Sequence, residues 1–504
     1  MTEHSTEPGT EVVIIGAGPA GLTAAYRLAA AGARPTVLES DDTVGGISRT
    51  VVHNGYRFDI GGHRFFTKVD AVRAMWHEVL GDDFLRRRRL SRILYRGRFF
   101  NYPLRPMNAL FSLGPLTSVR VLGSYLYAHL FPLRDERSFE DWVVNRFGRR
   151  LFEMFFKTYT EKVWGTSCDQ ISADWAAQRI RGLSLKNALL DALRIAPRGR
   201  EVITTLVDTF DYPRLGPGMM WERAAERLHT AGHPVSLQSR VTRLVTRGNR
   251  VTSVQYLQDG RTHEIDTPHV ISSMPVRDLV QSLDPAPPSA VLDAAAALKY
   301  RDFLTVAVVV DKAHLFDDNW IYIHDPAVRV GRIQNFKNWS PQMVPDAQTT
   351  CLGLEYFCFE DDDLWSMDDN ALAGLALREL RELGLLRDAQ VLDSAVVRVA
   401  KAYPVYDDGY AQALHVIRDY LSTFDNLQLV GRNGMHKYNN QDHSMLTAML
   451  AAQNVLGARH DLWSVNAEQA YHESIAADDA PLADDIAALA ASQPAVPTTL
   501  RDRQ

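Results

Sequence analysis

The pattern of apolar and polar positions begins with a strand–helix–strand unit. Residues 12–15 are a short β-branched apolar run, which predicts a buried strand. An alanine- and leucine-rich segment at 19–31 predicts a helix, and 35–39 predicts a second strand. This order is typical of a parallel sheet covered by helices.

The pattern changes further along the chain. Residues 69–196 are mostly helical in pattern, although 93–100, with Arg96-Gly97 at its turn, predicts a hairpin beside a substrate cleft. Strand-like alternation returns after residue 236. Later strands are expected at 236–256, 263–272, 302–310, 349–358 and 427–430, and later helices at 370–385 and 445–456.

The most apolar stretch, residues 113–133, contains Arg120 and His129. The chain has no run of about 18 apolar residues, so no transmembrane segment is expected. We interpret 113–133 as a core helix, with a membrane-surface element as the alternative. The first 11 residues are polar, lack the features of a secretory signal and are expected to be disordered.

Charge and cysteine content exclude several classes of protein. The 504 residues carry 55 Lys and Arg against 61 Asp and Glu, a net charge of −6, which argues against a nucleic acid polymer as partner. Cys168, Cys351 and Cys358 are too few for a disulfide framework or a four-cysteine zinc site. No metal site is expected, and the cysteine content favours a reducing, cytoplasmic location.

A glycine-rich turn joins the first strand to the first helix. Gly16 and Gly18 allow a tight turn and close backbone approach to a pyrophosphate, and Gly21 allows the helix to pack closely on the strand. The helix N-terminus offers free N–H groups to phosphates. Glu39 ends the second strand 18 residues after Gly21, where its carboxylate can accept hydrogen bonds from a ribose. These features predict dinucleotide binding.

Further glycine pairs favour FAD over NAD. Gly45-Gly46 follows Glu39 and precedes Arg49, and Gly61-Gly62 precedes His63. This pattern resembles the FAD-binding superfamily that includes amine oxidases, protoporphyrinogen oxidases and UDP-galactopyranose mutases. The late strand with Gly431-Arg432 resembles the C-terminal FAD segment of the same group. Further cofactor-binding residues expected from the resemblance are Val241, Gln441, Asp442 and Ser444.

The resemblance implies an α/β fold. It combines a discontinuous, Rossmann-like FAD-binding domain with a helical insertion domain and an antiparallel β-sheet substrate domain. The expected boundaries are 12–68, 217–275 and 425–460 for the FAD-binding domain, 69–200 for the helical insertion, 201–216 and 276–424 for the substrate domain, and 1–11 and 475–504 for flexible tails.

Several segments, in one chain order, resemble the UDP-galactopyranose mutase family. They include a loop that would lie over the flavin, a helix that would carry a substrate arginine, and a tyrosine followed ten residues later by an arginine. The segments are 58–63, 163–179, 212–218, 320–341, 403–404 and 431–444. The resemblance implies a nucleotide-diphosphate sugar as substrate.

A buried diphosphate requires fixed cations, and arginine offers a planar, always-charged fork. Arg179 and Arg332 are the candidates, although an isolated arginine is more often a surface ion pair. The tyrosines that resemble substrate-binding positions can donate hydrogen bonds to phosphate oxygens or can be half-buried core residues. The expected substrate-binding residues are Tyr102, Arg105, Trp164, Tyr322, Tyr403, Tyr438 and Asn440.

His63 is the third candidate catalytic residue. The resemblance implies that it lies against the isoalloxazine and tunes N5, and the alternative is a core histidine. At Leu104-Arg105 the chain departs from the Phe-Gln that helps to hold uracil in the eukaryotic-type mutases. The base and the sugar therefore stay open. The arginine-rich strip at 86–98 is either an electropositive approach for an anionic substrate or a solvated hairpin.

The resemblance implies a redox-neutral isomerase. Its reaction would be pyranose–furanose interconversion through attack of N5 of reduced FAD on the anomeric carbon. An FAD-dependent oxidoreductase of the protoporphyrinogen-oxidase or amine-oxidase type is the alternative. NAD(P)H is a possible external reductant, although a second glycine-rich dinucleotide motif is absent from the sequence. The oligomeric state is open between a monomer and a homodimer.

Overall fold

The computed structural model describes residues 9–102, 104, 112–171, 173, 209–407 and 409–466. It confirms the predicted N-terminal unit, which consists of β1 (Glu11–Ile15), α1 (Pro19–Ala30) and β2 (Arg34–Leu38). β1 and β2 run parallel, with Ile14 opposite Val37. The apolar side chains of both strands are buried, as expected for a parallel sheet covered on both faces.

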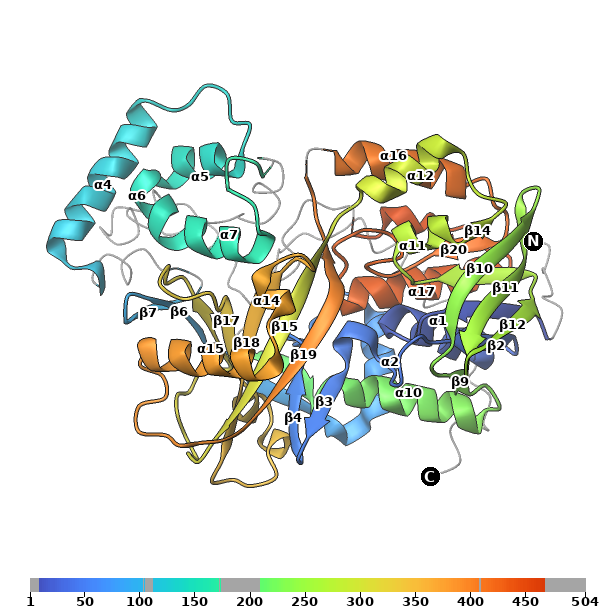
Figure 1. Cartoon of the computed structure of the whole chain (residues 1–504), viewed down its shortest axis with the longest axis horizontal. Coiled ribbons are helices and arrows are strands. Elements are labelled where there is room, and N and C mark those ends of the chain that lie inside the picture. Colours follow the sequence, from blue (N-terminus) through green and yellow to red (C-terminus); the bar gives the residue numbers. More distant parts are fainter. Residues whose placement is uncertain are drawn as a thin grey trace.

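The parallel sheet is assembled from distant parts of the chain (Figure 1). Its strand order is β20-β13-β1-β2-β9, and every neighbouring pair is parallel. The added strands are β9 (Val235–Ser236), β13 (His269–Ser272) and β20 (Leu427–Leu429). The domain that contains the glycine-rich turn is therefore discontinuous in sequence.

Four helices pack around this sheet. α1 packs against α17 (Gln441–Val455), and α10 (Gly218–Thr230) packs against both α1 and α2 (Asp70–Leu80). Trp76 of α2 meets Trp221 of α10 edge to face, with ring centroids 5.8 Å apart. Residues 70–80, expected in the helical insertion, thus belong to the core of the parallel-sheet part.

A mixed, seven-stranded sheet forms the second large body. Its order is β19-β15-β18-β17-β16-β6-β7, and all pairs are antiparallel except β16 with β6. Its strands are β6 (Ser91–Tyr95), β7 (Arg98–Asn101), β15 (Tyr300–Val310), β16 (Trp320–Ile323), β17 (Arg332–Asn335), β18 (Thr350–Cys358) and β19 (Val391–Pro404). β6 and β7 confirm the predicted hairpin, although they lie in the range that was expected to be largely helical.

The two faces of this sheet pack against different parts of the molecule. Alternate side chains such as Leu304, Ile333 and Leu354 pack against α15 (Asp369–Glu382) in one apolar core. Because successive strand residues point to opposite faces, the intervening side chains point away from α15. Their face lies toward the parallel-sheet body, and the candidate site is built on it.

Smaller sheets complete the two bodies. β10, β11 and β12 form an antiparallel meander, and β14 pairs with β10 in parallel. The strands are β3 (Thr50–His53), β4 (Tyr56–Asp59), β5 (Phe84–Arg88), β8 (Thr209–Pro213), β10 (Arg240–Arg247), β11 (Arg250–Gln258), β12 (Arg261–Asp266) and β14 (Leu283–Asp284). β3 pairs with β4, and β5 pairs with β8.

Three helices expected in or beside the substrate domain share the core of the parallel-sheet part. They are α11 (Val276–Gln281), α12 (Ser289–Ala297) and α16 (Tyr410–Leu421). Val276 and Ile417 are among their fully buried residues in that core. In the second half of the chain, the seven-stranded sheet therefore starts later, at β15, and ends earlier, at β19, than the expected range 276–424.

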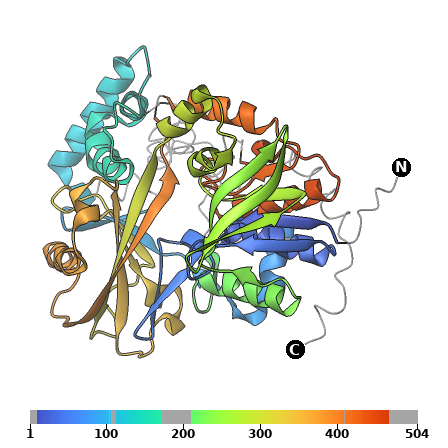
Figure 2. The same ribbon diagram turned by 45° about the vertical axis from the view of Figure 1, so that its right-hand side comes forward.

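A group of helices stands apart from both sheets. Figures 1 and 2 place α4 (Pro115–Leu130), α5 (Phe139–Phe147), α6 (Arg149–Phe152) and α7 (Thr158–Trp164) at the end of the molecule away from the parallel sheet. Their aromatic-rich core includes Phe139 and Phe152.

The expectation of a core helix at 113–133 is only half right. α4 buries Val121, Tyr125 and Ala128, but several large apolar side chains on its other side are exposed. No helix in the described ranges is long and apolar enough to cross a membrane. Of the predicted tails at 1–11 and 475–504, residues 1–8 and 475–504 lie outside the described residues, whereas Glu11 already belongs to β1.

Candidate active site

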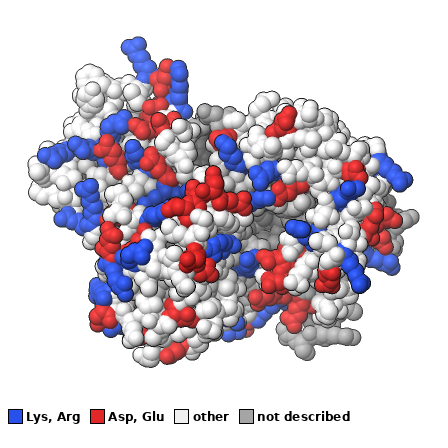
Figure 3. All heavy atoms as spheres, in the orientation of Figure 1, with Lys and Arg blue, Asp and Glu red and all other residues white. Residues whose placement is uncertain are grey.

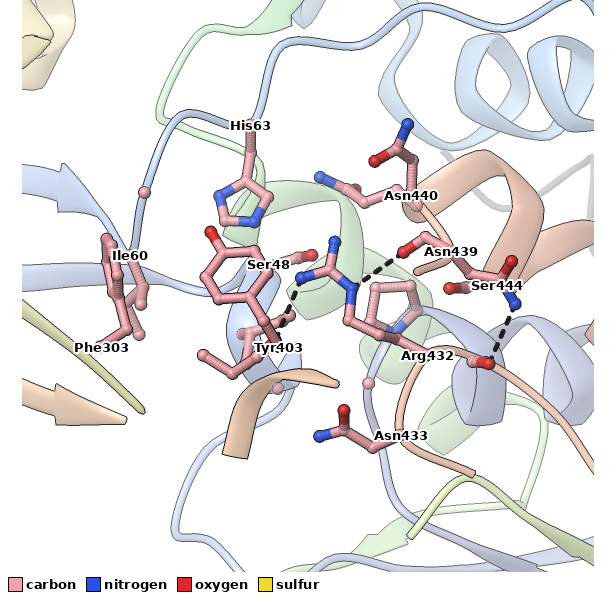
Figure 4. Close-up of a pocket in the computed structure, with 18 of the residues that line it drawn as sticks. Ser48, Ile60, His63, Phe303, Tyr403, Arg432, Asn433, Asn439, Asn440 and Ser444 are labelled. Carbon is pink, nitrogen blue, oxygen red and sulfur yellow. Dashed lines mark hydrogen bonds between the residues drawn. The ribbon is translucent and has the colours of Figure 1, made fainter. Parts of the chain in front are cut away.

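A cavity of about 1040 Å³ lies between the parallel sheet, the seven-stranded sheet and α7. Its lining runs from the glycine-rich turn at one end to the inner face of the seven-stranded sheet at the other. Figure 4 shows its central part, where His63 and Tyr403 point toward each other with the guanidinium of Arg432 beside them. A dinucleotide needs a long, enclosed site of this kind.

The glycine-rich turn is shaped for close backbone packing. Gly16 has a φ of +95°, and a Cβ on Gly21 would lie 1.8 Å from the carbonyl oxygen of Gly16. Only glycine fits at Gly21, because the helix packs directly on the turn. Gly16 and Gly18 line the cavity beside the N-terminus of α1.

Glu39 is held in place by backbone N–H groups. Its buried carboxylate accepts hydrogen bonds from the backbone N–H of Ala17 at 2.6 Å and of Asp41 at 2.9 Å. The same carboxylate lines the cavity. It therefore couples the glycine-rich turn to the end of β2 at the cavity wall.

The second glycine pair closes around the first turn. A Cβ on Gly46 would lie 3.3 Å from the Cα of Gly18, and Gly45 has a φ of +99°. Arg49 lines the cavity and pairs with Asp41 at 2.6 Å. The two glycine loops thus form a narrow cradle for an extended polyanionic group, and side chains larger than hydrogen would fill it.

The C-terminal segment supplies the other wall of the cradle. Arg432 donates from Nε to the carbonyl oxygen of Asn439 at 2.9 Å and from Nη1 to that of Ala402 at 3.2 Å. Asn440 is the N-cap of α17, and it forms a capping box with His443. Gly431, Gln441, Asp442, Ser444 and, from β10, Val241 also line the cavity.

His63 follows Gly61-Gly62 in the cavity wall. Burial, together with the charges of Arg432 and Arg332, lowers the pKa of His63 to about 3. Its ring is therefore neutral at physiological pH. Nδ1 of this ring is buried, and the backbone of Gly61 lies close enough to the ring to affect the pKa of His63.

Strand register creates a polar row on the inner face of the seven-stranded sheet. Tyr322 of β16 lies opposite Arg332 of β17, which lies opposite Glu355 of β18. Arg332 donates from Nε to Glu355, and Gln334 donates to the other oxygen of the same carboxylate at 2.7 Å. The spacing of Tyr322 and Arg332 in the sequence is thus the spacing of a β-hairpin pair.

The row is strongly polarised. Burial raises the pKa of Glu355, and the neighbouring Arg332 opposes this shift. Burial also disfavours the charge of Arg332, but Glu355 and the surrounding tyrosines outweigh it and hold the pKa of Arg332 above its usual range. No described residue accepts a hydrogen bond from the terminal nitrogens of Arg332. The guanidinium therefore stays charged, with two nitrogens left for a ligand.

Aromatic rings surround this cation. Tyr102 lies 4.6 Å and Tyr159 5.5 Å from Tyr322 between ring centroids. Tyr403 and Tyr438 stack at 5.7 Å. Burial raises the pKa of Tyr403 to about 12, so its hydroxyl remains a donor. Trp164 lies 6.3 Å from Tyr438 and closes this end of the cavity from α7.

Most of the residues predicted from the sequence thus line one cavity. Arg105 and Arg179 lie outside the described residues. Gly21 and Gly45 do not line the cavity themselves, but they allow close packing of the backbone next to residues that do, Gly16 and Arg49. The arginine strip divides: Arg92 pairs with the buried Asp318, whereas Arg89 lies 5.5 Å from the ring of Tyr102. Arg86, Arg87 and Arg98 also donate hydrogen bonds to neighbouring protein groups, and Arg86, Arg88, Arg96 and Arg98 are exposed.

Sequence reasoning missed several lining residues. They are Ser48, Arg64, Tyr159, Ser273, Phe303, Trp320, Gln334, Asn433 and Asn439, with Glu355 behind them. Two signals were present in the sequence. Tyr159 and Val163 have the i, i+4 spacing of one helix face, and Glu355 interrupts an otherwise apolar predicted strand.

Comparison with known proteins identifies the family and the fold of the chain. The sequence pattern of the flavin containing amine oxidoreductase family matches residues 19–456. Phytoene desaturase (neurosporene-forming) of Rhodobacter capsulatus is 40% identical over 80 residues, 16% of this chain and 15% of that protein. Protoporphyrinogen oxidase 2 of Arabidopsis thaliana is 42% identical over 65 residues, 12% and 13% of the two chains. These matches span a small part of either protein.

Solved structures match over nearly the whole chain. Reduced UDP-galactopyranose mutase superposes with a TM-score of 0.78 at 23% identity, covering 91% of this chain and 98% of the mutase. Putrescine oxidase bound to putrescine gives 0.59 at 17% identity, with 89% and 99% covered. The expected α/β fold and the likeness to both proteins are confirmed at the level of the fold. The chain belongs to the family of flavin containing amine oxidoreductases.

Proposed function

We propose that this chain is an FAD-dependent pyranose–furanose mutase that acts on a nucleotide-diphosphate sugar. The observation that carries the proposal is Arg332, whose side chain is 18% exposed and opens into the cavity. Glu355 binds this guanidinium through Nε alone, and tyrosine rings surround it. A fixed, charged fork in a deep cavity suits a diphosphate, because removing that dianion from water requires a cation that is already in place.

The chain's residues have distinct tasks in this proposal. Arg332 binds the diphosphate and keeps it beside the sugar after the glycosidic bond has broken. The hydroxyls of Tyr322, Tyr403 and Tyr438 donate to phosphate oxygens, and Trp164 excludes water. The neutral ring of His63 contacts the cofactor without adding charge. Arg179 is the candidate for a second cation on the diphosphate.

The cradle formed by Gly16, Gly18, Gly46 and Glu39 suits the pyrophosphate and ribose of FAD. Bound FAD in its reduced form would supply a nucleophile, N5, for the anomeric carbon. NAD(P)H is the proposed source of reduction. The chain's three cysteines are buried thiols, which suits a reducing cytoplasmic location.

The test compares Arg332→Ala and Arg332→Lys with the wild type. Each protein is reduced with dithionite without oxygen and offered a panel of nucleotide-diphosphate sugars, and products are separated by chromatography. We expect both variants to retain flavin absorbance. Turnover should fall at least about a hundredfold, because a buried dianion loses its fixed fork.

The matched control is Arg329→Ala. Arg329 precedes the same strand but pairs with Asp363 on the surface, so its loss should leave turnover nearly unchanged. Isomerisation by Arg332→Ala at the wild-type rate would overturn the proposal. Competition by UDP, TDP or GDP with the bound sugar nucleotide then identifies the base that the site prefers.

An FAD-dependent oxidoreductase is the second candidate. The family description and the curated relatives, a desaturase and oxidases, favour it. This reaction would consume oxygen or another acceptor in step with substrate, whereas a mutase converts many substrate molecules after one reduction. Oxygen uptake during turnover therefore separates the two candidates.

A further inference from the structure

The outward side of α4 is apolar and exposed. Its large side chains there are Leu116 (67% exposed), Val119 (67%), Leu126 (57%), Tyr127 (67%) and Leu130 (72%). They recur at the helical spacing that gives one continuous face, opposite the buried Val121, Tyr125 and Ala128. Phe131 and Leu133 extend it beyond the helix end. We call these seven exposed residues the α4 face.

Such a face is unusual on a protein surface. Single exposed apolar residues are ordinary, but a contiguous patch of large ones marks a contact with another apolar phase or partner. The other exposed large apolar residues of the described chain, Val52, Leu90 and Leu392, are scattered over other elements.

The unpaired charges around the α4 face are positive. Residues 112–134 contain no Asp or Glu. The next carboxylates along the chain, Asp135 and Glu136, pair with Arg137 at 3.4 Å and with Arg146 at 2.8 Å. Arg120, on α4, and Arg134, after it, are exposed, and neither forms an ion pair with a described residue. In Figure 3 the outer left edge, over α4, is white with blue patches. An apolar face edged by unpaired cations complements an anionic, apolar surface.

The position of α4 allows a flat surface to approach it. α4 forms the outer edge of the helical group at the far end of the molecule in both views (Figures 1 and 2). The helix has 16 residues, and no described helix meets the length and apolarity required to span a bilayer. It can therefore lie on a membrane but cannot cross one.

We propose that the α4 face docks onto the surface of a bilayer that contains anionic lipids. A second copy of the chain fits less well. A two-fold contact pairs a face with itself, so it would place the unpaired Arg120 and Arg134 of both copies in one interface. The adjacent carboxylates, Asp135 and Glu136, already pair with Arg137 and Arg146. The proposal concerns a surface remote from the cavity and does not depend on the reaction.

The experiment is flotation of the full-length, flavin-loaded protein with lipid vesicles. One set contains phosphatidylcholine alone, and the other contains equal parts of phosphatidylcholine and phosphatidylglycerol. We expect the protein to float with the anionic vesicles and to be released by high salt, because the arginine contribution is screened.

Two variants and one control test the face itself. The double variant Leu126→Glu, Leu130→Glu should lower partition onto anionic vesicles on the order of tenfold or more, because two apolar side chains that would insert into the bilayer are replaced by negative charges. The double variant Arg120→Gln, Arg134→Gln should lower binding to the anionic vesicles but leave any binding to phosphatidylcholine vesicles unchanged. Leu392→Glu, at an exposed site on β19, should bind as the wild type does.

Three results would overturn the proposal. The first is failure of the wild type to float with anionic vesicles. The second is a dimer on size-exclusion chromatography that the Leu126→Glu, Leu130→Glu variant converts to a monomer, which would assign the face to a second copy. The third is a lower melting temperature of this variant with unchanged flotation, which would mean that the chain itself covers the face.

Discussion

Glu355 sets the orientation of Arg332, the arginine that we propose binds the diphosphate. Its carboxylate accepts from Arg332 on one oxygen and from Gln334 on the other, and it is fully buried. Removal of the carboxylate leaves the mostly buried guanidinium of Arg332, which is 18% exposed, without its partner, at a cost of up to about 3–5 kcal/mol. Glu355 is therefore a positioning residue for Arg332.

We predict different outcomes for two substitutions of Glu355. Glu355→Gln keeps one acceptor oxygen for Arg332, but it removes the charge and replaces the oxygen that accepts from Gln334 with an NH2 donor. We therefore expect KM to rise about tenfold with a smaller change in kcat. Glu355→Ala should also lower the free energy of unfolding by about 3 kcal/mol. Steady-state kinetics and urea unfolding measure the two effects. Equal losses of kcat and stability in both variants would contradict the positioning role.

His324 makes the stability of the protein sensitive to acid. Burial, with the charge of Lys162, lowers the pKa of His324 to about 3, and its ring stacks on Tyr159 at 4.8 Å. The unfolded value is about 6.5. The neutral ring therefore contributes its full stability above pH 6.5, and this contribution is lost as the pH falls from 6.5 toward 3.

The corresponding test is His324→Phe. Below pH 6.5 the wild type should lose about 1.4 kcal/mol of unfolding free energy per pH unit relative to the variant. Urea unfolding at several pH values measures the difference. His415→Phe, at an exposed position on α16, is the control. Parallel stability curves for wild type and His324→Phe would show that His324 does not remain neutral in the fold.

At the residue scale the sequence was most informative where a residue belongs to a local motif. The glycines and Glu39 could be predicted because their roles depend on one strand–turn–helix. Tyr322 and Arg332 came from a resemblance, and the hairpin register explains their spacing. Glu355 could not be assigned a role, because only the pairing of β17 with β18 brings it to Arg332.

At the element scale, Gly21 determines how α1 sits on β1. A Cβ at this position would lie 1.8 Å from the oxygen of Gly16 and 3.4 Å from Ile14. The helix would have to move away from the turn, and the cradle for the cofactor would open. The clash is with backbone atoms of Gly16, which cannot move aside as a flexible side chain can. The substitution therefore destabilises the whole strand–turn–helix unit.

We therefore predict that Gly21→Ala loses flavin. The purified variant should show little absorbance near the flavin bands and a lower melting temperature, and added FAD should not restore either. Gly374→Ala on α15 is the control, since its Cβ would meet only the end of the Arg378 side chain at 3.4 Å. That change should stabilise the helix by up to about 1 kcal/mol. Normal flavin content in Gly21→Ala would contradict the packing argument.

Some elements could not be placed from periodicity. β6 and β7 were expected as a hairpin, but β6 joins the seven-stranded sheet through a parallel pair with β16, more than two hundred residues later. α4 is apolar on both sides, and apolar content alone does not tell a buried helix from one that binds a surface. Long-range pairing and the environment of each face decide both cases.

At the scale of the whole molecule, the site depends on how three bodies meet. The cofactor cradle belongs to the parallel sheet, Arg332 to the seven-stranded sheet, and Trp164 to the helical group. The sequence indicated a discontinuous FAD domain because its motifs occur at both ends. The boundaries of the other bodies follow from packing, and α11, α12 and α16 join the parallel-sheet core instead of the substrate sheet.

Arg301 fastens the helical group to the seven-stranded sheet. From β15 its buried guanidinium donates to the carbonyl oxygens of Lys162 at 3.3 Å, Val163 at 3.2 Å and Phe357 at 2.9 Å. A Cβ on Gly165 would lie 2.5 Å from the same guanidinium. The clamp thus fixes the C-terminal end of α7, which carries Tyr159 and Trp164 into the cavity.

We predict that Arg301→Leu separates substrate binding from cofactor binding. Three carbonyl oxygens lose their donor, so the free energy of unfolding should fall by about 1–3 kcal/mol. FAD content should be unchanged, because the cradle is in another body, whereas KM for the sugar nucleotide should rise about tenfold as Trp164 loses its position. Gly165→Ala should act in the same direction by displacing the guanidinium.

Arg398→Leu, which removes a clamp to Met367 and Asp369 from β19, should lower stability without raising KM. If Arg301→Leu loses FAD and keeps the wild-type KM, the helical group does not form the substrate wall, and the division of the site among three bodies is wrong.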